Sequence, residues 1–134
     1  MASGPGTLTL PSGRVPYEAH RARALVLAAR GRPDEALSEL NEGWTDDWPL
    51  PAVYLTDVAR VHLLAGRYAQ AIEALHLAVR GTEHAEPEVP ALACECVRNA
   101  PELWRRALEL AFAGGTVSQR TRTAWFVLRG RLAA

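Results

Sequence analysis

The sequence predicts an all-α protein in which antiparallel helix pairs stack into a superhelix. Ten residues, GRPDEALSEL at 31–40, return as GRYAQAIEAL at 66–75, an offset of 35 residues. A period of this length is typical of stacked supersecondary units, none of which can bury its apolar face alone. In both copies an alanine and two aliphatic residues also follow at helical spacing. These two observations define the predicted fold class.

Each copy begins with a Gly-Arg pair, which we expect to end one helix and to introduce the next. The second helix then carries one apolar face. Its members are Ala36, Leu37 and Leu40 in the first copy, and Ala71, Ile72 and Leu75 in the second. The small alanine allows the two helices of a pair to approach closely.

The remaining elements follow in order along the chain. Residues 1–16 are rich in Gly, Pro and Ser and are expected to form a tail, with a short extended stretch at 7–10; residues 17–134 form one domain. Pro49 and Pro51 suit the start of a helix. Helices are expected at 17–30, 33–42, 51–65, 68–80, 89–99, 101–113 and about 117–132.

The last three helices are expected to complete the stack. Residues 89–99 and 101–113 would form a degenerate third pair, which Gly114 and Gly115 end. The final helix holds Ala124, Trp125, Leu128 and Leu132 on one stripe. We expect this stripe to cover the open end of the repeat core as a C-terminal capping helix.

Charge is distributed unevenly along a chain whose net charge is zero. All 15 basic residues are arginine, and residues 1–32, 33–97 and 98–134 carry +4, −9 and +5. Separated charges of opposite sign favour self-association, so a homodimer is expected. There is no apolar run of membrane-spanning length and no secretory signal, which predicts a cytoplasmic protein without membrane contact.

The repeated residues resemble the tetratricopeptide repeat, a helix-turn-helix unit of about 34 residues with a turn glycine and a small residue early in its second helix. The resemblance covers 17–80 as two units. Tyr68 follows the family pattern, whereas Pro33 replaces it in the first unit. The resemblance implies a noncatalytic adaptor, scaffold or chaperone-like module that holds a protein, peptide or helix in a concave groove lined by the first helix of each pair.

The resemblance selects the outward face of each first helix as the partner site. Expected partner-binding residues are Arg21, Leu25, Val53, Thr56, Arg60 and Leu63, together with Trp48. Two arginines with two leucines suit an amphipathic peptide that bears a carboxylate. The alternatives are an ordinary solvated face and, for Trp44 or Trp48, a role in filling the gap between adjacent units.

Catalysis is not expected, because the sequence contains no glycine-rich phosphate loop, nucleophile motif or His-Glu-x-x-His pair. No cofactor and no metal are expected either, since the cysteines Cys94 and Cys96 have no zinc-ligand spacing around them. Small buried hydrophobic residues are the simplest interpretation of both cysteines.

DNA binding is the alternative function. The basic segment 111–131 follows the order of a helix-turn-helix, with a Gly-Gly turn before the expected recognition helix. Its nucleic-acid-binding residues would be Arg120, Arg122, Arg129 and Arg131. The chain also resembles the helical-repeat portion of bacterial transcriptional activators, in which such units bind partners rather than DNA. The acidic middle would confine nonspecific attraction to one end of the molecule.

Overall fold

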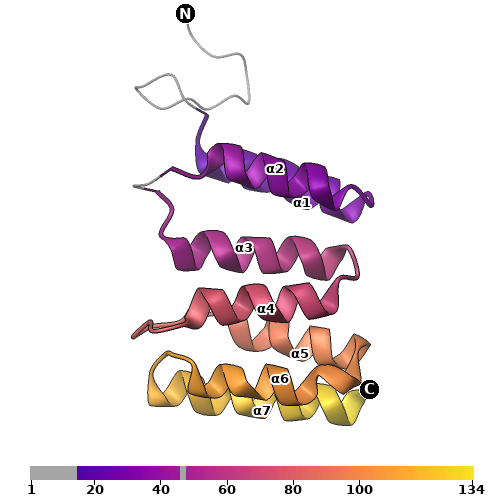
Figure 1. Ribbon diagram of the computed structural model, residues 1–134, viewed down its shortest axis with the longest axis vertical. Coiled ribbons are helices and arrows are strands. Elements are labelled where there is room, and N and C mark those ends of the chain that lie inside the picture. Colours follow the sequence, from indigo (N-terminus) through magenta and orange to yellow (C-terminus); the bar gives the residue numbers. More distant parts are fainter. Residues whose placement is uncertain (1–14, 46–47) are drawn as a thin grey trace, which may run out of the picture.

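A computed structural model describes residues 15–45 and 48–134, and within them the chain forms an all-α stack of helix pairs (Figure 1). Residues 1–14 of the expected tail at 1–16, including its extended stretch at 7–10, and the acidic pair Asp46 and Asp47 lie outside the described residues. The elements are α1 (Tyr17–Ala29), α2 (Pro33–Gly43), α3 (Pro51–Leu64), α4 (Tyr68–Val79), α5 (Val89–Asn99), η1 (Pro101–Leu103), α6 (Trp104–Leu108), η2 (Glu109–Phe112) and α7 (Val117–Ala133). The all-α prediction is confirmed.

The repeated Gly-Arg pair closes the turn of each of the first two helix pairs. Gly31 and Gly66 have φ angles of 79° and 77°, the left-handed region that glycine adopts without strain. The next residue then donates its backbone N–H back to the helix: Arg32 to the carbonyl of Leu27 at 2.9 Å, and Arg67 to that of His62 at 2.8 Å. The internal sequence repeat therefore corresponds to one turn geometry used twice.

Small residues lie where the helices of each pair meet. Ala36 is fully buried between α1 and α2, and Ala71 is only 1% exposed in the α3/α4 pair. The two pairs join through α3, because Val58 packs against both hydrophobic clusters of the core. Among the described residues, no helix combines the length and the apolar character needed to cross a bilayer.

The third unit differs from the expected pair of helices. Residues 101–112 form two 3-10 turns around the short helix α6, and α5 packs most extensively on α7 instead. Pro101, which lacks a backbone N–H, begins the first of these turns. Ala107 still faces the core, as its place in the repeat pattern predicts.

The prediction that the apolar stripe of α7 covers the repeat core is wrong. Trp125 is 62% exposed and Leu132 is 86% exposed, whereas Thr123, Val127 and Gly130 are buried. A Cβ added at Gly130 would lie 2.6 Å from the carbonyl oxygen of Cys94, so α7 touches α5 at glycine. Close approach between two helices selects small side chains, and the bulky apolar residues consequently lie on the opposite side.

The start of α7 is tied to the connector between α4 and α5. Thr116 and Gln119 form a reciprocal capping box. The Gln119 amide also donates to the carbonyl of Ala85 and accepts from its N–H, each at 2.9 Å. A Cβ at Gly114 would lie 1.9 Å from the carbonyl oxygen of Val79, so packing alone explains that glycine.

The substitution Ala71→Leu should lower the free energy of unfolding by about 1 to 3 kcal/mol, because leucine overpacks the contact between α3 and α4. Ala69→Leu, on the exposed side of the same helix, should change it by less than about 0.5 kcal/mol. Urea denaturation measures both values. Equal losses from the two variants would contradict the proposed helix contact.

Candidate functional site

The first helices of the three units form one continuous face, since α3 contacts both α1 and α5. Asp57 of α3 lies at its centre and is only 3% exposed. The Tyr17 hydroxyl donates to one carboxylate oxygen of Asp57 at 2.6 Å, and the Arg21 guanidinium donates to the other at 2.8 Å. A buried carboxylate needs such partners, because an unpaired one loses its hydration without compensation.

Arg60 continues this arrangement toward the third unit. Its Nε lies 4.0 Å from an Asp57 carboxylate oxygen, and its Nη2 lies 3.7 Å from a carboxylate oxygen of Glu88 at the start of α5. Charges of alternating sign thus cross the face in the order Arg21, Asp57, Arg60 and Glu88. We call these four residues the charged row.

The protonation state of the groups around Asp57 is well defined. Burial, and then the hydrogen bond to Asp57, raise the pKa of Tyr17 well above its usual range. The same carboxylate raises the pKa of Arg21, chiefly through their hydrogen bond. Both side chains therefore keep their protons at neutral pH and remain donors to Asp57.

The face differs from the expected partner site in three residues. Thr56 is 2% exposed and donates its hydroxyl to the carbonyl of Ala52 at 2.7 Å, so its assignment to an outward surface is wrong. Leu25 and Leu63 are partly buried and pack against the two core clusters. The reason is that α3 has neighbours on both sides, which cover much of the face that an isolated helix would expose. Val53 is half-buried.

The two tryptophans of the connector between the first two pairs have different environments. Trp44 stacks on Tyr54 with ring centroids 4.4 Å apart, and its indole N–H donates to the carbonyl of Pro49 at 3.0 Å. Trp48 is exposed. Trp44 therefore fills the junction between units, while Trp48 has an accessible indole.

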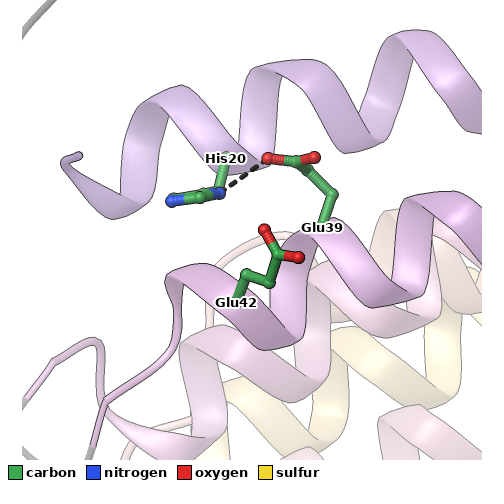
Figure 2. Close-up of side chains that lie close together, drawn as sticks. All are labelled: His20, Glu39 and Glu42. Carbon is green, nitrogen blue, oxygen red and sulfur yellow. Dashed lines mark hydrogen bonds and ion pairs between the residues drawn. The ribbon is translucent and has the colours of Figure 1, made fainter. Parts of the chain in front are cut away.

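One side-chain cluster on α1 and α2 has the composition of a cation site. Figure 2 shows His20, Glu39 and Glu42, whose nearest ligand atoms all lie within 4.8 Å of one another. His20 Nδ1 lies 2.6 Å from a Glu39 carboxylate oxygen, and Arg23 lies 3.4 Å from the same oxygen. Gly43 makes room for the imidazole, because a Cβ there would lie 2.7 Å from that of His20.

Within residues 15–45 and 48–134, these three are the ones that could hold a metal ion, but the pairing of His20 with Glu39 explains the position of those two without one. Sequence reasoning missed the cluster, because it depends on which residue of α1 faces the last turn of α2. The spacing of Glu39 and Glu42, three residues apart on one helix, was the available signal.

The arginines expected to bind DNA all lie on α7 and are exposed. Arg122 and Arg129 lie over the ring of Phe126 at 5.6 Å and 5.5 Å, and Arg131 lies over Trp104 at 4.1 Å. These cation-π contacts give three of the four side chains a local packing partner. Helix α7 contains no acidic residue to offset their charge.

The fold and the face define a class of protein, an all-α stack of helix pairs with an ordered, charged surface on its first helices. No family model matches the chain, and no curated protein or solved structure is significantly similar to it. The tetratricopeptide resemblance therefore rests on the residues of this chain alone, and it stays a prediction.

Replacing the central carboxylate should destabilise the protein. Asp57→Ala removes the acceptor of two hydrogen bonds and leaves Tyr17 and Arg21 unpaired, so we expect a loss of about 3 kcal/mol. Tyr17→Phe removes one of the two bonds and should cost about 1.5 kcal/mol. Chemical denaturation gives both values, with Glu18→Ala on the exposed side of α1 as the control. A loss for Asp57→Ala no larger than that of the control would contradict the role assigned to the carboxylate.

Proposed function

We propose that this protein is a noncatalytic interaction module that holds a peptide or helix of a protein partner on the face formed by α1, α3 and α5. The charged row carries the proposal. It runs from α1 through α3 to the residue before α5, and its members pair with one another, from the 2.8 Å bond at Arg21 to the 3.7 Å pair at Glu88. A surface whose side chains are ordered before binding loses less conformational entropy when a partner docks.

The partner should carry charges of both signs. Arg21 and Arg60 already pair with acidic residues, so they do not by themselves favour a carboxylate-bearing peptide. Further along the face, Glu95 and Arg98 of α5 form a half-exposed pair at 3.0 Å. An ion pair this exposed opens at little cost, and its members can exchange partners.

The chemistry of the cysteines agrees with a noncatalytic function. Burial raises the pKa of the Cys96 thiol to about 12, which leaves almost no thiolate at neutral pH. Both cysteines are free thiols. A cytoplasmic location is part of the proposal.

The proposal is tested by reversing charge on the exposed part of the face. Arg60→Glu is unsuitable, because it would place a new carboxylate beside the buried Asp57. Glu95→Arg changes only a half-exposed residue, so the melting temperature should stay within about 2 °C of the wild type. Affinity capture from cells of the source organism, read by mass spectrometry, should lose its specific partner with this variant.

Gln70→Arg is the control, since it introduces an arginine at an exposed position of α4, a second helix. It should retain the partner. A partner bound equally by the wild type and both variants would place the interaction elsewhere and would refute the proposal for this face.

DNA binding remains the second candidate, favoured by one observation: α7 carries four exposed arginines and no acid. If α7 binds duplex DNA, Arg120→Ala combined with Arg122→Ala should weaken the binding and reduce the slope of log affinity against log salt by about 2. Gel-shift titration at two salt concentrations measures this. Glu95→Arg should leave the affinity unchanged, and the absence of any shift at low salt eliminates this candidate.

A further inference from the structure

Both ends of the helix stack expose apolar side chains. Helix α7 lies at the C-terminal end of the stack (Figure 1). Its Trp125, Leu128 and Leu132 are 62%, 40% and 86% exposed, and helical spacing puts them on the side opposite its buried residues Thr123, Val127 and Gly130. Terminal elements of stacked repeats ordinarily carry a polar outer face. An exposed apolar stripe on the terminal helix therefore indicates a surface that binds another molecule or segment.

The N-terminal end presents small apolar residues instead. Ala22, Val26 and Leu27 of α1 line a shallow apolar depression together with the aliphatic part of Arg23. Val26 is 49% exposed although it is flanked by core-facing Ala24 and Ala28. Bulky side chains such as those of α7 pack well onto an alanine-rich helix, which is how the pairs within the stack already pack.

Charge also differs between the two ends. Helix α7 carries four arginines and no acid, whereas α2 carries four acids and no base. Most charged groups near the α1/α2 seam are already paired: His20 and Arg23 with Glu39, Arg32 with Glu35, and Arg67 with Asp34. Glu42 is left without an ion pair among the described residues. It lies in the last turn of α2, where the helix dipole adds negative potential.

We propose that the occupant of the α7 face is a second copy of this protein, docked head to tail. The apolar stripe of α7 packs on the outer face of α1 in the next copy, and an α7 arginine reaches Glu42. The contact joins two different surfaces, so it leaves a free end on each copy and builds open chains. A symmetric contact of α7 with α7 is disfavoured, because it would bring arginines of both copies together.

This inference does not depend on the proposed function, because the docking surface uses Ala22, Val26 and Leu27 of α1, whereas the charged row uses Arg21 of that helix. The test uses sedimentation equilibrium over a range of protein concentrations at low salt. The wild type should increase in mean mass with concentration without reaching a plateau at the dimer. Raised salt should weaken this association, because it screens the arginine-carboxylate contacts.

Two variants separate the two surfaces. Val26→Asp alters the α1 end, and Leu128→Asp with Leu132→Asp alters the α7 end; each should weaken self-association at least about tenfold. An equimolar mixture of the two retains one intact α1 surface and one intact α7 surface. It should therefore form a dimer that does not extend, and this result is specific to a head-to-tail contact.

Leu77→Asp is the control, since it adds the same charge at a half-exposed leucine on α4, away from both ends. It should associate like the wild type, and circular dichroism should show folded protein for every variant. A monomeric wild type at all concentrations would overturn the proposal, as would a mixture that stays monomeric while the wild type associates. Sedimentation with vesicles of anionic lipid by the wild type, without self-association, would overturn it in favour of a membrane.

Discussion

The relative position of the first two units depends on one buried carboxylate, that of Asp57. Asp57 is nearly inaccessible to water, and both of its oxygens accept hydrogen bonds from α1, one from Tyr17 and one from Arg21. A charge in that position is tolerated only while both donors are present. The carboxylate therefore fixes how α1 lies along α3, and hence where the rest of the charged row falls. The proposed partner face follows from this one requirement.

Small residues impose the second constraint. Helices of a pair meet at alanine or glycine, as at Ala36 and Ala71, and at Gly130, where a methyl group would collide with the backbone of α5. In α7, the side that carries Gly130 is buried against α5, and Trp125 and Leu132 on the other side are exposed. One packing rule thus accounts for the close pairs and for the apolar end of the stack. Self-association would bury the exposed apolar side chains of α7 without any change in the fold.

Local patterns in the sequence predict most of this fold. The Gly-Arg turns, the buried alanines and nearly all helix boundaries follow from spacing and from turn chemistry, because these are set by neighbouring residues. The α7 stripe was wrongly predicted to face inward, since periodicity identifies a stripe without saying which side has a neighbour. The sequence also did not predict that residues 101–112 form two 3-10 turns and a short helix, because the alanine and leucine residues around Ala107 are typical of a continuous helix.

The site was harder to predict, because it depends on the register between helices far apart in the chain. Asp57 pairs with residues 36 and 40 positions away, and no local pattern predicts which side chains will meet. A signal was present, however, since Asp57 is the one acidic residue of α3. The most direct test of its role is amide hydrogen exchange, read by mass spectrometry, in Asp57→Asn. We expect faster exchange in α1 and α2 and unchanged protection in α5 and α7; unchanged exchange throughout, or a uniform increase along the chain, would contradict the account.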